Sequence, residues 1–243
     1  MHRRRTALAQ DRGIANRLLM ALPNDDYQRL LPDMKTVPLT LKQVLHPRER
    51  PIRFVYFPND GVCSYTTVMR DGTKVEVATV GKEGMVGIRT LLGGNRSVSE
   101  TFVQSASRNS TAVRLPIDCF RRELARHGAL EEVLQRYSQA FLASVMQCIA
   151  CNALHTVHQR CARWLLMVHD RMDGDEFVLT QQFIAIMLGT RRPTVNGVAT
   201  QLQRMGLIRY THGRIQILNR SGLEAASCEC YGSIQQEFER QKL

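Results

Sequence analysis

Acidic residues are absent from a long part of this chain, and long apolar runs are absent from all of it. Residues 177–223 contain six arginines in 47 positions without a single Asp or Glu. No apolar run approaches the roughly 18 residues that a membrane-spanning helix requires. The N-terminus, MHRRRTALAQDRGIANRLL, has a basic head but lacks the apolar core of a secretory signal. We therefore expect a cytoplasmic chain with no membrane partner.

Signatures of the common enzyme classes are also absent. The chain has no phosphate-cradling glycine loop that ends in Lys-Ser/Thr, no Gly-x-Ser-x-Gly and no His-Glu-x-x-His. Glu83 and Asp71 fall in expected turns, and nothing in the sequence pairs them for acid–base chemistry. The sequence therefore predicts no catalytic residues and no enzyme.

Positive charge is what the chain has in excess. Over 243 residues the formal net charge is +11, and the sequence pI is about 9.7. Such an excess favours a polyanionic partner, and because a membrane surface is also polyanionic, charge alone does not choose between lipid and nucleic acid. Because 44% of the residues are hydrophobic, the chain can bury a core, and global disorder is not expected. The acid-free segment is typical of a surface that contacts the phosphate backbone of double-stranded DNA.

Between Lys35 and Leu115 short alternating segments are separated by turn residues. These segments are RFVYF, VCSYTTVM, TKVEVATV, TFVQSA and STAVRL. Strands at a spacing of about ten residues with Asp-Gly turns indicate an antiparallel sandwich or barrel. Ahead of them, residues 17–31 predict a short pair of helices broken at Pro23.

After Pro116 the pattern becomes helical. Residues 117–128 predict one helix, and residues 129–154 predict a long helix without Pro or Gly. Because its apolar side chains lie on more than one face, the long helix must be buried twice, against its own β domain and against its copy in a homodimer. One apolar row has the three-four spacing of a coiled coil and is the predicted dimer seam: Leu134, Tyr137, Phe141, Ser144, Cys148, Cys151 and His155. A second apolar row needs a different cover and consists of Val133, Leu142, Val145, Met146 and Ile149.

The acid-free segment begins with two short amphipathic helices, after a helix over about 157–171 that Thr156 can cap. Thr180 is placed to cap a helix over 181–188, and Gly189 supplies a tight turn. The second helix runs from about Pro193 to Met205, and IRYTHGRIQIL then predicts a hairpin that turns at His212-Gly213. Two helices and a hairpin in this order indicate a winged helix-turn-helix. The buried stripe predicted for its second helix is Val195, Val198, Ala199, Leu202 and Met205.

In this motif the N-terminal end of the second helix enters the major groove of DNA. An arginine there can bridge the O6 and N7 atoms of guanine, and we assign this base contact to Arg192. Thr190, Arg191 and Arg204 are assigned to phosphates, which set register rather than sequence. The full predicted DNA-binding set, including the wing, is Thr190, Arg191, Arg192, Pro193, Thr194, Asn196, Gly197, Thr200, Arg204, Arg209, His212 and Arg214.

The order of these elements, and above all TQQFIAIMLGTRRPTVNGVATQLQRMGLI, resembles the Crp/Fnr-type transcription regulators over roughly residues 17–220. The resemblance implies an α+β fold with an N-terminal, jelly-roll-like antiparallel β-roll of the cyclic-nucleotide-binding type. It also implies a homodimer that binds a palindromic promoter site and touches RNA polymerase. The parts are then a basic tail (1–16), a β-roll sensor (17–127), a dimerisation helix with hinge (128–156), a winged helix-turn-helix (157–222) and a C-terminal tail (223–243).

The recognition helix matches the family only in part. Arg192 stands at the position of the family's base-reading arginine. Pro193 and Gly197 stand where the cyclic-AMP receptor branch has an acid and a second arginine. The operator sequence of that branch is therefore not transferred to this chain.

The expected effector pocket departs further from the family. Gly87 is followed by Ile88, where nucleotide-binding members have an acid that holds the ribose. Arg96-Ser97 resembles the phosphate-binding pair but lies about three residues too early relative to the strand TFVQ. Cyclic AMP is therefore not the expected ligand, and the effector is unknown.

Seven cysteines are an odd number for a chain without a secretory signal, and we expect reduced thiols. Cys148, Cys151, His155 and His158 could share one helical face, where thiolates and imidazoles can hold zinc or iron. We favour simple packing at the dimer seam, because a hinge near Thr156 would take His158 off that face. A metal- or redox-sensing regulator that uses Cys148, Cys151 and His155 is the alternative.

Two further cysteines lie near the C-terminus, in Cys228-Glu229-Cys230. They are expected to be an ordinary exposed thiol pair. The Fnr branch holds its iron–sulfur centre with an N-terminal cysteine cluster, but no cysteine precedes Cys63 in this chain.

Overall fold

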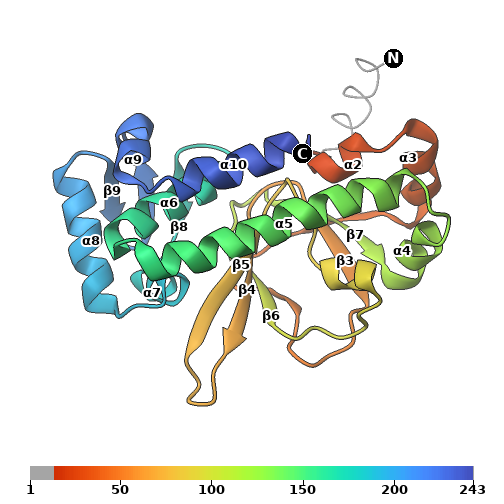
Figure 1. Cartoon of the computed structure of the whole chain (residues 1–243), viewed down its shortest axis with the longest axis horizontal. Helices are drawn as coiled ribbons and strands as arrows, with labels where there is room; N and C mark the ends of the chain where they lie inside the picture. Colours follow the sequence, from red (N-terminus) through yellow and green to blue (C-terminus); the bar gives the residue numbers. More distant parts are fainter. Residues whose placement is uncertain (1–13, 243) are drawn as a thin grey trace.

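The computed structural model describes residues 14–242, so most of the predicted basic tail (1–13) lies outside the described residues. The fold is α+β, as predicted, with antiparallel sheets, a long central helix and a C-terminal helix-turn-helix (Figure 1). Among the helices of this described part, none has the length and apolarity needed to span a membrane.

Two antiparallel sheets form the β-roll. One has the order β1-β7-β3, with β1 Lys35–Pro38, β3 Phe54–Pro58 and β7 Thr111–Pro116. The other has the order β2-β6-β4-β5, with β2 Val44–His46, β4 Val62–Val68, β5 Lys74–Val80 and β6 Glu100–Ser105. The five strands expected from the alternating segments are β3 to β7. Apolar side chains such as Val55, Phe57 and Val103 fill the space between the sheets.

Short helices precede and follow the strands of the β-roll. They are α2 (Arg17–Ala21), α3 (Asn24–Leu30) with the turn η1 (Leu31–Asp33), and α4 (Ile117–Leu124). The first begins at the buried Asn16, whose side chain accepts the N–H groups of Leu18 and Leu19. Its amide donates to the Pro58 carbonyl at 2.9 Å and to the Gly84 carbonyl at 2.8 Å. Residues 14–16, assigned to the tail from the sequence, are thus fixed on the β-roll.

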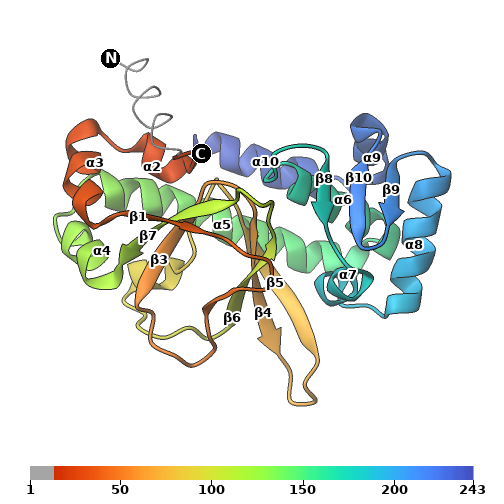
Figure 2. The ribbon, with the colours of Figure 1, turned by 180° about the vertical axis from the view of Figure 1, so that it is seen from behind.

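The long helix α5 (Ala129–Leu154) crosses the molecule and links the β-roll to the C-terminal domain (Figures 1 and 2). Its first half is buried against the β-roll through Leu130, Leu134 and Tyr137. His155 is its C-cap, and α6 (Val157–His169) begins after Thr156. The predicted capping box of α6 is present, with Thr156 and Gln159 bonded reciprocally.

The C-terminal domain contains α6, the helices α7 (Gln181–Leu188) and α8 (Arg192–Arg204), and a small sheet. The sheet has the order β8-β10-β9, with β8 Glu176–Val178, β9 Ile208–Thr211 and β10 Arg214–Ile217. The segment described as a C-terminal tail forms two helices, α9 (Arg220–Ala226) and α10 (Cys230–Arg240). Helix α10 packs along α5 and also touches α6.

One hydrophobic core continues from the β-roll into the C-terminal domain. At the junction the ring centroids of Phe102 (β6) and Phe183 (α7) lie 6.0 Å apart. The indole N–H of Trp164 (α6) donates to the carboxylate of Glu76 (β5) at 2.9 Å. The helix-turn-helix is therefore docked on the β-roll, with α7 against the sheet and α8 on the far side (Figure 2).

Candidate nucleic-acid interface

The predicted helix-turn-helix is present, and Gly189 sets its turn. The Thr180 hydroxyl caps α7 by accepting the N–H of Phe183 at 3.3 Å. Gly189 ends α7 with φ of 57°, in the left-handed region that favours a residue without Cβ. Helix α8 then starts with Arg192 and Pro193, and the fixed φ of proline suits this first turn.

The inner face of α8 agrees with the predicted stripe at four of its five positions. Val195, Val198, Ala199 and Leu202 are buried. Met205 is 51% exposed, so the prediction is wrong there. The helix ends at Arg204, and the chain turns away into β9 before a further helical position can face inward.

The predicted DNA-binding residues all lie on α8, just before it, or on the hairpin β9–β10. All of them are exposed except Thr190 and Thr200, which are half-buried. Gly197 faces open space, since a Cβ added there would meet no atom within 4 Å. The outer face of α8 is therefore free to approach a flat or grooved partner.

A small polar network holds Arg192 at the start of α8. Its Nε donates to Oε1 of Gln181 at 3.2 Å, and Nε2 of Gln181 donates to Oδ1 of Asn196 at 3.1 Å. Gln181 lies in the first turn of α7 and was not among the predicted site residues. The helix pattern leaves it on a polar face but does not reveal that α7 brings it to Arg192.

The wing turns at His212-Gly213, as predicted. Both residues have positive φ, 52° and 77°, as a two-residue hairpin turn of type I′ requires. Arg209 donates to Gln216 at 3.2 Å, and Arg214 forms an ion pair of 2.8 Å with Glu176 of β8. Part of the wing charge is thus compensated by an acid that lies one residue outside the acid-free segment.

The arginines of the acid-free segment divide into two groups. Arg214 is paired with Glu176, and Arg220 is paired with Asp170 at 2.7 Å. Within the described residues the other four arginines form no ion pair, and they surround the outer face of α8 and the wing: Arg191, Arg192, Arg204 and Arg209. Unpaired exposed guanidinium groups leave a positive surface suited to phosphates.

Comparison with known proteins agrees with this geometry. Residues 159–226 match the family model described as the Crp-like helix-turn-helix domain. This segment is a Crp-like helix-turn-helix domain. Among curated proteins, none matches the chain significantly.

Solved structures extend the likeness to most of the chain and confirm the predicted resemblance at the level of the fold. FixK2 from Bradyrhizobium japonicum is 16% identical, with a TM-score of 0.66 over 80% of this chain and 98% of that protein. TTHB099, a CRP-family transcriptional regulator from Thermus thermophilus, is 20% identical, with a TM-score of 0.58 over 79% and 96%. The c-di-GMP-responsive regulator CLP from Xanthomonas campestris is 14% identical, with a TM-score of 0.60 over 80% and 99%. At these identities the likeness establishes the Crp/Fnr fold.

The β-roll of this Crp/Fnr fold contains a cavity of about 230 Å³ where the effector pocket was predicted. Gly87, Ile88 and Ser97 line it, but the exposed Arg96 does not. The Gly87 N–H donates to the Tyr65 hydroxyl at 2.9 Å, which occupies the backbone donor. Arg89 is the charged residue among its lining side chains, which also include Phe141 and Val145 of α5.

The two apolar rows of α5 have covers that differ from the prediction. Leu134, Tyr137 and Cys151 of the predicted dimer seam are buried inside the protomer, where the β-roll and the C-terminal segment cover them. The exposed part of the helix is the C-terminal part of the second row, with Leu142, Met146 and Ile149 at 60%, 63% and 66% exposure and Val145 half-buried beside them. Their spacing of four and three is that of a coiled-coil seam. Val133, the first member predicted for that row, is instead buried in the core. The protomer has thus used the predicted seam for its own packing.

The predicted thiol pair is not exposed. Cys228 and Cys230 are 3% and 1% exposed, because α10 folds back along α5 and turns their side chains inward. Cys148 lies outside their cluster and accepts a hydrogen bond from Arg163 at 3.4 Å. His158 belongs to α6 and, as expected from the hinge, is separated from the face of α5.

Proposed function

We propose that this protein is a homodimeric, sequence-specific transcription regulator of the Crp/Fnr type that binds a palindromic promoter site and contacts RNA polymerase. The observation that carries the proposal is the set of four unpaired arginines around the exposed face of α8 and the wing. No acidic residue of segment 177–223 opposes them. A helix-turn-helix with this surface has the charge and shape to enter the major groove.

Within this proposal Arg192 reads a base. Its guanidinium group is steadied by Gln181, which in turn bonds to Asn196, so the side chain is partly ordered before DNA arrives. A bidentate contact to guanine suits its planar fork of donors. Arg191, Arg204 and Thr190 lie beside it and contact phosphates, while the wing residues Arg209, His212 and Arg214 contact the backbone further along.

The second copy binds along α5. Leu142, Met146 and Ile149 form an apolar row with no cover within the described residues of one protomer. Each exposed apolar side chain buried at such a seam contributes about 1.5–3 kcal/mol. A Met146→Glu variant should shift the protein from dimer to monomer in sedimentation analysis. Leu92→Glu, on the exposed turn η2 (Ile88–Leu92), is the matched control and should leave the dimer intact.

Selection of binding sites from a random DNA library tests the proposal as a whole. A dimer should enrich two inverted half-sites with centres about 34 Å, or ten base pairs, apart. Affinity should fall steeply with salt, with log K decreasing by about 0.9 per phosphate contacted for each tenfold rise in salt. Failure of the wild-type protein to enrich any sequence would overturn the assignment.

The effector pocket is proposed not to take cyclic AMP. A nucleotide monophosphate needs charge-assisted contacts for its phosphate and an acceptor for its ribose hydroxyl. The cavity has Ile88 where that acceptor is expected, and the exposed Arg96 does not line it. Calorimetry with cyclic AMP should therefore register no binding, whereas saturable micromolar binding would contradict this part of the proposal.

A further inference from the structure

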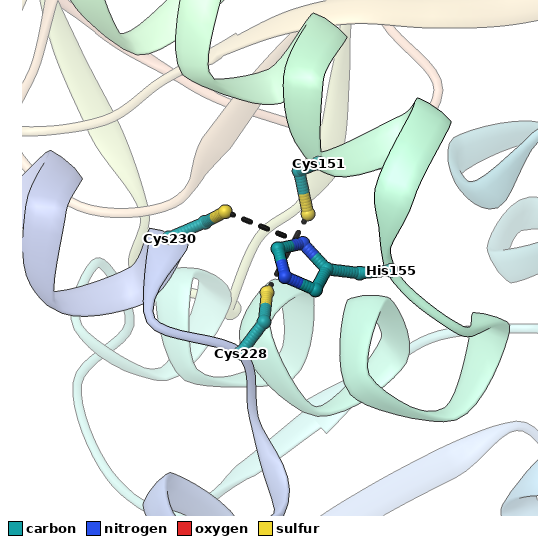
Figure 3. Close-up of side chains that lie close together, drawn as sticks. All are labelled: Cys151, His155, Cys228 and Cys230. Carbon is teal, nitrogen blue, oxygen red and sulfur yellow. Dashed lines mark hydrogen bonds between the residues drawn. The ribbon is translucent and has the colours of Figure 1, made fainter.

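Four potential metal ligands from two distant parts of the chain converge at the end of α5. They are Cys151 and His155, at the last turn and C-cap of that helix, and Cys228 and Cys230, just before α10 (Figure 3). Their ligand atoms all lie within 4.8 Å of one another. Cys151 Sγ is 3.5 Å from Cys228 Sγ, and Cys230 Sγ is 3.5 Å from His155 Nδ1.

These separations fit a single ion. With zinc–sulfur bonds of about 2.3 Å, tetrahedral ligands lie about 3.8 Å apart. The two closest separations here are 3.5 Å and none exceeds 4.8 Å, which is the same scale. A centre with several iron atoms would spread its thiolates further, so the size favours one ion. We propose that Cys151, His155, Cys228 and Cys230 bind one zinc ion.

The surroundings of the cluster are those of a metal site. Nδ1 of His155 faces the thiols, and its Nε2 lies 3.2 Å from a carboxylate oxygen of Glu229. A carboxylate on the outer nitrogen of a ligating histidine fixes the ring and its tautomer. The amide of Gln147, one turn before Cys151, donates to Cys230 Sγ at 3.0 Å, as a donor to a thiolate would.

The negative charge of the site is partly offset. Three thiolates and one Zn²⁺ carry one net negative charge. Arg163 of α6 is buried at 5% exposure and lies one helical turn from the cluster, beside Cys148. Its guanidinium donates to the sulfurs of Cys148 and Met167. A buried cation beside a site of one net negative charge offsets the cost of burying either charge alone.

The position of the site gives the ion its role. Four protein ligands leave no open coordination position, which is typical of structural and not catalytic zinc. The cysteines are almost fully buried, and His155 directly precedes Thr156, the N-cap of α6. The ion therefore fastens α10 to the junction between the dimerisation helix and the DNA-binding domain. It sets the angle at which α6 leaves α5.

Elemental analysis of the full-length protein tests the site without reference to DNA, so its outcome is independent of the proposed function. Protein purified in reducing buffer without a metal-affinity step should contain one zinc per protomer. Cys228→Ser and Cys230→Ser should each lose the ion. Cys148→Ser, one turn from Cys151 but outside the cluster, is the matched control and should keep it.

A cobalt titration of the wild-type protein tests the site without depending on whether the variants fold. Metal-free wild-type protein titrated with Co²⁺ should develop the intense visible bands of a tetrahedral site and thiolate-to-cobalt charge transfer, with an endpoint at one equivalent. Hydrogen exchange at 152–156 should be slower with zinc than after chelation. The proposal is overturned if wild-type protein takes up neither ion, if Cys230→Ser keeps full zinc, or if iron with acid-labile sulfide is found. A Cys151–Cys228 disulfide formed by mild oxidation, without metal affinity, would overturn it equally.

Discussion

The two helices of the helix-turn-helix are adjacent in sequence but meet opposite surroundings. Helix α7 lies against the β-roll, where Met187 contacts the side chains of Ser64 and Gln104 and Phe183 packs near Phe102. Helix α8 buries one stripe and leaves its polar face open. The difference is instructive because one helix fixes the orientation of the domain and the other presents side chains to a partner.

Helices α6 and α7 are held on the β-roll by polar contacts as well as by apolar packing. Glu76 accepts hydrogen bonds from Ser64 at 2.6 Å, from Gln104 at 3.1 Å and from Trp164 at 2.9 Å. Behind it, the buried Arg171 pairs with Glu83 at 2.7 Å. Buried polar groups with several partners define one arrangement sharply, since any shift leaves a group unsatisfied. The docked orientation is therefore specific.

Trp164→Ala should have the largest effect, because it removes support from the docked helices alone and leaves the exposed face of α8 unchanged. The indole is 3% exposed and bridges α6 to β5. Loss of a buried tryptophan costs about 3–5 kcal/mol of unfolding free energy. Urea unfolding measures this loss. Trp164→Phe retains most of the packing and should cost clearly less, and equal costs for the two variants would contradict the bridging role.

Arg192→Ala should weaken specific DNA binding by the exposed face of α8 and leave the stability of the protein unchanged. Specific DNA affinity should fall by about 1–3 kcal/mol, or roughly 5- to 150-fold, and discrimination at one base pair should relax. Fluorescence anisotropy with the selected site and with single-base variants measures both. Arg204→Ala should weaken binding to all sequences alike, and a loss of discrimination in that variant would reverse the assigned roles.

The contact between Glu76 and the docked helix α6 should make stability depend on pH. Burial raises the pKa of the Glu76 carboxyl from 4.5 to about 7, although hydrogen bonds from Ser64, Trp164 and Gln104 and the charge of Arg163 oppose the rise. A raised folded-state pKa stabilises the protein below pH 4.5, and this contribution is lost as pH rises through 7. Relative to wild type, Glu76→Gln should thus gain stability between pH 5 and 7.5, with a slope of at most about 1.4 kcal/mol per pH unit. Parallel urea midpoints for the two proteins would contradict the shift.

Thr156→Ala should have the smallest effect, at the hinge that both helices depend on. The hydroxyl of Thr156 accepts the Gln159 N–H and forms half of the capping box. Removing such a cap costs about 1 kcal/mol. Thermal unfolding measures it, and Thr156→Ser, which retains the oxygen, should behave as wild type.

Most helices and strands of this chain could be predicted because their limits depend on residues that are close together in the sequence. The strands β3 to β7, the limits of α5, the cap at Thr156 and the turn at Gly189 each depend on residues close together in sequence. The buried faces of the helices could be predicted for the same reason, since the spacing of apolar residues indicates which face is covered. Periodicity failed at Met205, where the helix had already ended, and at Val133, which is buried while the rest of its predicted row is exposed or half-buried.

Pairing between distant segments could not be predicted in this way. The row Leu134 to His155 was correctly recognised as buried, but the sequence does not state whether the cover is a second copy or the chain's own β-roll and C-terminal segment. Cys228 and Cys230 looked like an exposed pair because the helical segment after them was not seen to fold back on α5. Similarly, the pairing of β10 with β8 brings Glu176 to Arg214, although 38 residues separate them.

The order of the parts, the caps and turns of the helix-turn-helix, and the acid-free basic surface follow from neighbouring residues and from composition, and they can therefore be read from the sequence. The fold alone reveals which apolar side chains of α5 remain exposed, how α7 docks on the β-roll, and that two cysteines near the C-terminus join Cys151 and His155. Those outcomes depend on the packing of surfaces far apart in the chain. Periodicity identifies a buried face but cannot name its partner.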